Sequence, residues 1–143
     1  MPNYQTPWRE APSTAAVRES ALRLAQAIVA LGDGVLLQHK RKLLRDVVWI
    51  VTEANGKYNT RYISEAVLKG QKPIQHEHVF PIEGLVEQML GNPDLIEQVL
   101  NSAIACLVTK EEHIRLGQSG EGWKRYRQAG IRVYDRLEGK WMG

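Results

Sequence analysis

The chain opens with a polar, proline-rich stretch and then shows apolar residues at helical spacing. Residues 1–12 hold three prolines and predict an irregular arm. After Ser13 or Thr14, either of which can cap a helix, apolar residues recur every three or four positions to about residue 31. Glycines at 32 and 34 then end the stripe. The pattern predicts one amphipathic helix over this range.

A second apolar stretch predicts another helix over about 36–54, with lysines and arginines on its outer face. Within it, residues 47–52 are rich in β-branched side chains, so a strand is an open alternative there. Asn55 and Gly56 predict a turn. The next stretch, 58–68, fits either a strand or a short helix.

The second half of the chain alternates short strand and helix patterns. Asp94 falls in a first helical turn, where a negative charge suits the helix dipole. Thr109 is placed to cap a helix that carries Glu111, Glu112 and His113. The expected strands are 71–79, entered through Pro73, then 104–108 and 131–134, and the expected helices are 82–90, 94–101, the one after Thr109, and 123–129.

These elements predict an α+β fold in a single domain over 1–143. After the arm at 1–12, a mainly helical part at 13–70 packs on a small antiparallel β-hairpin followed by a helix at 71–117. A C-terminal helix and strand occupy 118–143.

Composition agrees with an ordinary soluble domain. The chain has 143 residues, of which 43% are hydrophobic and 24% charged, enough to form a core without covalent crosslinks. Its single cysteine excludes an internal disulfide and a cysteine-based zinc site. No apolar run is long enough for a bilayer, and the first residues lack the order of a secretory signal. We therefore expect a cytoplasmic protein without a membrane partner.

Charge is distributed unevenly along the chain. Residues 1–70 hold ten Lys or Arg against six Asp or Glu, and 113–143 hold seven against three. The centre, 71–112, holds two against seven. Basic flanks around an acidic middle suit a polyanion at the flanks and a cation in the middle. A solvated acidic helix face would give the same pattern, so both interpretations stay open.

The segment 75–81 carries the most specific chemistry. Glu77 stands directly beside His78, and apolar residues and Pro81 follow. Such a pair can hold a divalent ion and a general base close together, which is what phosphodiester hydrolysis needs. His113, after the apolar run 104–108, could supply a second metal ligand.

Two motifs resemble the HNH nucleases, also called the ββα-metal or His-Me finger family: Glu77-His78-Val79-Phe80-Pro81, and the stretch 106–113 that ends in His113. The resemblance covers about residues 73–117. It implies a ββα-metal core with His78 as general base, Glu77 and His113 as ligands of one Mg²⁺ or Mn²⁺, and DNA cleavage.

The chain departs from the family pattern in two respects. Ile104 stands where the family has an asparagine that orients the base through the backbone, and Asn101 and Ser102 are the nearest polar residues. The spacing from His78 to His113 is also longer than is common, which an inserted helical pair would explain.

The geometry of a strand limits which of these side chains can reach one site. Successive strand residues point to opposite faces, so a bend or bulge is required for Glu77 and His78 to reach one site. By the same alternation, His76 shares a face with His78 and is a rival for the base.

We therefore expect an HNH-like, metal-dependent endonuclease that acts on DNA in preference to RNA, in phage defence, restriction or a mobile element. The alternatives are a non-catalytic regulator that binds nucleic acid or protein on a degenerate HNH-like scaffold, and a metal-free ribonuclease pairing His76 or His78 with His113. The oligomeric state is open, a homodimer included. Candidate nucleic-acid contacts lie among C-terminal aromatics that could equally pack inside: Lys124, Arg125, Arg127 and Arg132.

Overall fold

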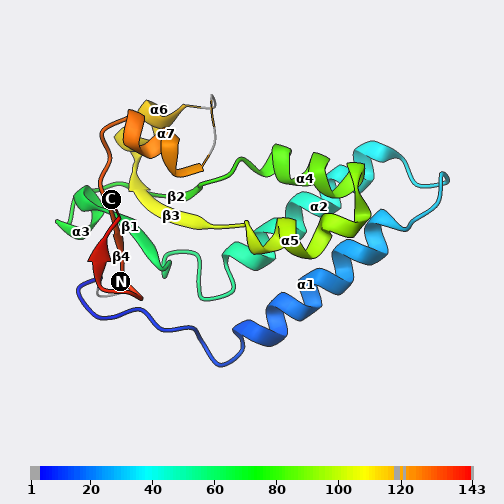
Figure 1. Cartoon of the computed structure of the whole chain (residues 1–143), viewed down its shortest axis with the longest axis horizontal. Helices are drawn as coiled ribbons and strands as arrows, with labels where there is room; N and C mark the ends of the chain where they lie inside the picture. The colour runs from blue at the N-terminus through cyan, green and yellow to red at the C-terminus, as the bar shows by residue number, and fades with distance from the viewer. Residues whose placement is uncertain (1–3, 118–119, 121, 143) are drawn as a thin grey trace. The chain divides into compact units, whose positions relative to one another are not determined.

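The computed structural model describes residues 4–117, 120 and 122–142. This part of the chain is α+β, with seven α-helices, one 3₁₀ helix and a five-stranded mixed sheet (Figure 1). It forms two compact units, each assembled from separate stretches. Unit 1 comprises the described residues of 1–10, 55–79 and 105–143, and unit 2 comprises 11–54 and 80–104.

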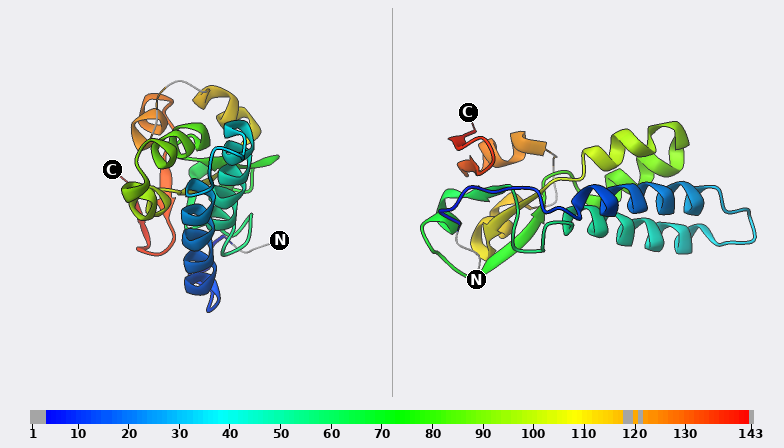
Figure 2. Two further views of the ribbon diagram at one scale, coloured as in Figure 1. Left: turned by 90° about the vertical axis from the view of Figure 1, so that its right-hand side faces the viewer. Right: turned by 90° about the horizontal axis from the view of Figure 1, so that it is seen from below.

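Unit 2 is entirely helical and has its own core. Its first two helices, α1 (Thr14–Val29) and α2 (Leu37–Thr52), lie side by side (Figure 2). Its others are α4 (Ile82–Gly91), the 3₁₀ helix η1 (Pro93–Leu95) and α5 (Ile96–Asn101). Apolar residues from all four α-helices form one cluster, which includes Ala25, Leu44, Val47, Val48, Val86, Met89 and Val99.

The helices predicted over 13–31, 36–54, 82–90 and 94–101 are confirmed with small shifts of their ends. The strand alternative for 47–52 is wrong, because Val47 and Val48 are buried on the inner face of α2. Ser13 stands at the N-cap of α1, but its side chain makes no capping hydrogen bond, since its backbone is already helical at φ −81° and ψ −11°. Asp94 lies in the first turn of η1, as predicted, and its amide donates to Asn92 Oδ1.

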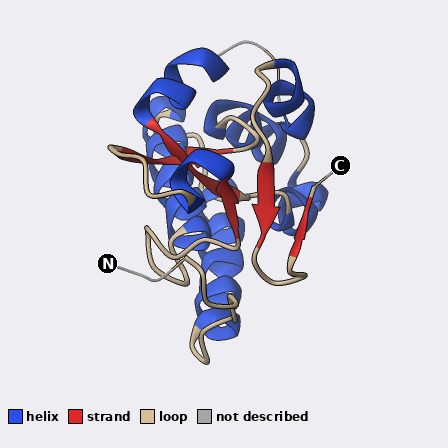
Figure 3. Cartoon of the chain, turned by 90° about the vertical axis from the view of Figure 1, so that its left-hand side faces the viewer, coloured by secondary structure: helices blue, strands red, loops and turns tan. Residues whose placement is uncertain are grey.

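Unit 1 is built on the sheet, whose strands are drawn in red in Figure 3. The strand order is β2-β3-β1-β4-β5. The strands are β1 (Tyr62–Ser64), β2 (Ile74–His78), β3 (Ala105–Thr109), β4 (Val133–Asp135) and β5 (Lys140–Trp141). β1 runs parallel to β3, and the other neighbouring pairs are antiparallel. The ambiguous stretch 58–68 holds both candidates, since the helix α3 (Glu65–Leu68) follows β1 directly.

The apolar run that predicts a strand before Thr109 becomes β3, next to the edge strand β2. All five of its residues are buried, as expected for a strand covered on both faces. Ile63, Val67 and Leu107 form a core cluster of unit 1. The strands predicted at 71–79 and 131–134 are confirmed as β2 and β4, whereas the two-residue β5 has too short a pattern to be foreseen.

The helix α6 (Lys110–Leu116) begins where the sequence predicts. Thr109 Oγ1 accepts from the amide of Glu112, and Glu112 Oε1 accepts from the amide of Thr109, at 3.1 and 2.9 Å. This reciprocal capping box starts the helix immediately after β3. The order antiparallel strand pair then helix, predicted for 71–117, is therefore present, with α4, η1 and α5 between the two strands in the sequence.

The helix α7 (Gly122–Gln128) corresponds to the prediction at 123–129. Among the described residues, no helix is both long and apolar enough to cross a bilayer.

Candidate functional site

The hairpin and α6 bring Glu77 and His113 into direct contact. Glu77 is the fourth residue of β2, and His113 lies one turn into α6, so the capping box that starts α6 also fixes the position of the imidazole. His113 Nδ1 lies 2.5 Å from Glu77 Oε2. The carboxylate is buried, at 6% side-chain exposure, while the imidazole is 40% exposed. The two predicted metal ligands thus meet, with the ring accessible to solvent.

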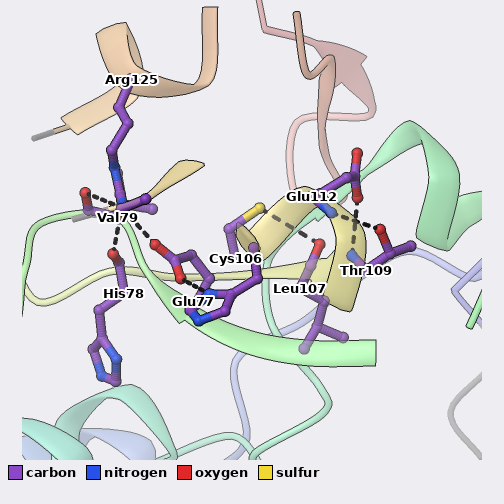
Figure 4. Close-up of polar contacts among 10 residues, drawn as sticks. Glu77, His78, Val79, Cys106, Leu107, Thr109, Glu112 and Arg125 are labelled. Carbon is purple, nitrogen blue, oxygen red and sulfur yellow. Dashed lines mark hydrogen bonds and ion pairs between the residues drawn. The ribbon is translucent and has the colours of Figure 1, made fainter. Parts of the chain in front are cut away.

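Arg125 of α7 holds the other carboxylate oxygen. Its Nη2 lies 2.6 Å from Glu77 Oε1, and both side chains are almost fully buried. The same nitrogen donates to the carbonyl oxygens of His78 at 2.9 Å and Val79 at 3.1 Å (Figure 4). Nη1 donates to the carbonyl of Gly117, at the end of α6, at 3.0 Å. One guanidinium therefore ties the carboxylate, the exit of β2 and the end of α6 together.

His78 faces away from this cluster. The pairing of β2 with β3 runs one to one from Ile74 opposite Thr109 to His78 opposite Ala105. The expected bend between Glu77 and His78 is therefore wrong, and ordinary alternation sends the His78 ring away from the Glu77 carboxylate (Figure 4).

The environment of His78 keeps its ring neutral. The side chain is buried, and burial together with the positive charge that His76 could carry lowers the pKa of His78 from 6.5 to about 3. The neutral ring is a weak base at that pKa. His78 in this position does not have the geometry expected of a base acting beside Glu77.

The prediction that His76 and His78 share a face is confirmed, with ring centroids 5.2 Å apart. His76 Nδ1 lies 2.6 Å from the carbonyl oxygen of Lys57. Since this face is opposite to that of Glu77, neither histidine is paired with His113. The arrangement required by the metal-free ribonuclease alternative is not formed.

Asn101 does not join the cluster within unit 1. It is the last residue of α5, is exposed, and belongs to unit 2. The contact with the backbone around His78 that we expected from an asparagine is made by Arg125 instead.

The four basic residues assigned to nucleic acid have different surroundings. Lys124 and Arg127 are exposed on α7. Arg132 is exposed, lies 2.7 Å from Glu65, and stacks over Trp141 at 4.3 Å from the ring centroid. The prediction that Arg125 contacts nucleic acid is wrong. Its side chain is buried and donates to backbone carbonyl oxygens, so it does not lie on a surface that could bind nucleic acid.

The aromatic residues near these cations divide between core and surface. Tyr126 is buried, and Trp123 packs against Tyr62 and Tyr126 with centroids 4.9 and 5.1 Å apart. Trp141 is 37% exposed. Trp141 keeps part of its ring at the surface but is already contacted by Arg132 and Tyr134, whereas Tyr126 lies in the core.

Glu77 and His113 carry donor types that bind divalent ions, but Oε2 and Nδ1 lie 2.5 Å apart and bond to each other directly, so an ion held by both would have to separate them. Carboxylate oxygen and imidazole nitrogen both bind Mg²⁺, Mn²⁺ or Zn²⁺, and His113 leaves the cluster open to water and substrate oxygens. The described residues contain no group of three or more His, Cys, Asp or Glu side chains placed to share an ion. Any ion here would take its remaining ligands from solvent or substrate.

The role of Arg125 was not predicted, although the residue spacing in α7 indicates that this arginine lies on the inner face of the helix. Gly122, Arg125 and Tyr126 form the buried side of α7, at the spacing of an inner helix face. An arginine on the inner face of a helix needs a buried anion, and Glu77 is the buried carboxylate it meets.

Comparison of the chain with protein-family models, with curated proteins and with solved structures found no match.

Proposed function

We propose that the protein is a metal-dependent endonuclease of the HNH type, in which Glu77 and His113 bind one Mg²⁺ or Mn²⁺ ion and DNA is the substrate. The contact between Glu77 Oε2 and His113 Nδ1 supports this proposal most directly, because it joins two residues 36 positions apart that the motif resemblance pairs. A hairpin followed by a helix supplies one ligand from each part.

The protein groups divide the chemical work. When bound, the ion would polarise the scissile phosphate and stabilise the leaving oxygen. Glu77 supplies the negative charge that attracts the ion, and His113 completes the pair with a ring nitrogen. The exposed cations Lys124, Arg127 and Arg132 would contact the phosphate backbone.

A second candidate function has its own supporting observation. His78 lies on the opposite face of β2 and is buried, and Arg125 already occupies Glu77 Oε1. These facts favour a non-catalytic regulator that binds nucleic acid on a degenerate HNH-like scaffold. On this alternative Glu77 is a structural ion-pair partner, and removal of divalent ions leaves DNA affinity unchanged.

Plasmid nicking tests the leading proposal. Supercoiled DNA is incubated with wild-type protein in Mg²⁺ or Mn²⁺, and with Glu77→Gln, His113→Ala and His39→Ala variants. His39 is exposed on α2 and serves as the matched histidine control. We expect nicking by the wild type and by His39→Ala, and a loss of at least about a hundredfold in the other two variants.

A wild type that nicks no faster than Glu77→Gln contradicts the enzyme proposal. DNA binding that persists in EDTA would then support the regulator. Nicking that is insensitive to EDTA would contradict both functions.

A further inference from the structure

We propose that Arg125 is a positioning residue, which holds the Glu77 carboxylate in place so that its second oxygen faces His113. This inference rests on the proposed function for its consequence at the metal, but its geometric part stands on contacts among protein groups alone.

The guanidinium of Arg125 serves four partners at once. Arg125 contacts Glu77 Oε1 at 2.6 Å and three backbone carbonyl oxygens, those of Gly117, His78 and Val79, at 2.9 to 3.1 Å. Gly117 follows α6, and the other two follow Glu77 in the chain. The planar fork of arginine can bridge these groups at once, whereas the single ammonium of lysine cannot.

The two oxygens of the Glu77 carboxylate have different partners. Oε1 faces Arg125, and Oε2 faces His113. The carboxylate therefore cannot rotate to offer both oxygens to one partner without giving up a buried ion pair. Arg125 thereby sets which oxygen is offered at the His113 side.

The backbone that leaves β2 is also held by α7. The carbonyl of Val79 accepts from Arg125 and also from the amide of Gly122, which begins α7. α7 is thus fastened to the strand end by its first residue and by its fourth. Loss of the Arg125 contacts would loosen the backbone next to Glu77 as well as the carboxylate itself.

The geometric part is tested without metal by a double-mutant cycle. Urea unfolding of Glu77→Gln, His113→Ala and the double variant gives the coupling free energy between the two side chains. The cycle is measured in three backgrounds: wild type, Arg125→Lys and Arg127→Lys. Arg127 is exposed on the same helix and is the matched control. We expect a coupling of about fivefold in the unfolding equilibrium constant for wild type and Arg127→Lys, and less than about twofold for Arg125→Lys. Equal coupling in all three backgrounds overturns the inference.

A measurement on the wild type covers the case in which Arg125→Lys does not fold. NMR of the arginine side chains should show separate, exchange-protected Nη resonances for Arg125 that broaden in Glu77→Gln. A freely rotating Arg125 guanidinium, with one averaged signal, overturns the inference.

The consequence at the metal is measured by Mn²⁺ titration of the folded variants. We expect Arg125→Lys to bind Mn²⁺ at least about tenfold more weakly than wild type, as is usual when a residue that orients a ligand is replaced, and Arg127→Lys to match wild type. Equal affinity in Arg125→Lys overturns the positioning role. A wild type that binds no Mn²⁺ but shows the Arg125-dependent coupling contradicts the proposed function alone.

Discussion

At the scale of single residues, Glu77 and Arg125 form a buried ion pair in unit 1. A buried charge costs several kcal/mol unless a partner compensates it, and these side chains are 6% and 5% exposed. His113, the other partner of Glu77, is 40% exposed, so Arg125 is the buried partner of this carboxylate. Glu77 and Arg125 are therefore important both for folding and for the proposed site.

Truncation of Arg125 should be strongly destabilising. We expect Arg125→Ala to lower the free energy of unfolding by about 3 kcal/mol, because Glu77 and the carbonyls of His78 and Val79 lose their donor. Arg127→Ala, at an exposed position of the same helix, should change it by less than about 0.5 kcal/mol. Urea denaturation measures both, and equal effects of the two substitutions would show that the ion pair contributes little.

His78 gives the protein a predictable sensitivity to acid. Its pKa is about 3 in the folded state against 6.5 for a free ring, so between these values only the unfolded state takes up the proton. The contribution of the neutral ring is complete above about pH 6.5 and is lost as the pH falls, by up to about 1.4 kcal/mol per pH unit.

The comparison of wild type with His78→Gln isolates the contribution of the His78 ring to the pH dependence of the unfolding free energy. From pH 7 to pH 5 the wild type should lose about 2 kcal/mol more unfolding free energy than the variant. His39→Gln, at an exposed position, should follow the wild type. Parallel pH curves for wild type and His78→Gln would mean that the ring is hydrated.

At the scale of elements, the start of α6 determines where His113 lies. The capping box between Thr109 and Glu112 also includes Ser64, whose hydroxyl donates to Glu112 Oε1 at 2.7 Å. The helix is therefore attached at once to β3 and to the end of β1.

We expect Thr109→Ala to lower the free energy of unfolding by about 1 kcal/mol, because the amide of Glu112 loses its acceptor, and Thr109→Ser to retain most of this stability. Ser13→Ala provides the contrast at α1, where the serine makes no capping hydrogen bond, and should be nearly neutral. Thermal or urea unfolding checks this order. A Ser13→Ala as costly as Thr109→Ala would contradict it.

Most elements could be foreseen from the sequence because their patterns are local. The stripe of α1, the apolar run of β3 and the Thr109 cap each need only a few neighbouring residues. The direction of the His78 side chain depends on the register of β2 against β3. That register pairs residues 27 to 35 positions apart, such as Ile74 with Thr109. The contact of Arg125 with Glu77 likewise joins distant elements, so no single segment could reveal it.

At the scale of the whole molecule, the described chain has two cores rather than one. The cluster in unit 2 and the cluster in unit 1 share no residue. The sequence predicts a single domain, and periodicity alone does not reveal that 80–104 joins 11–54 in a separate compact unit.

Substitutions in the two cores should act locally. We expect Leu44→Ala to accelerate amide hydrogen exchange mainly in 11–54 and 80–104, and Leu107→Ala mainly in the strands of unit 1. Each should cost about 2 to 5 kcal/mol within its unit. Exchange that rises equally in both units for either variant would show that the chain unfolds as one cooperative body.

The central claim is that Glu77 and His113 bind a divalent ion together, and Mn²⁺ titration followed by electron paramagnetic resonance tests it most directly. Wild type should bind one Mn²⁺ per chain, and Glu77→Gln should lose this binding. Glu97→Gln, which changes an exposed carboxylate on α5, should bind as wild type does. Absence of Mn²⁺ binding by the wild type, or equal binding by wild type and Glu77→Gln, would contradict the claim.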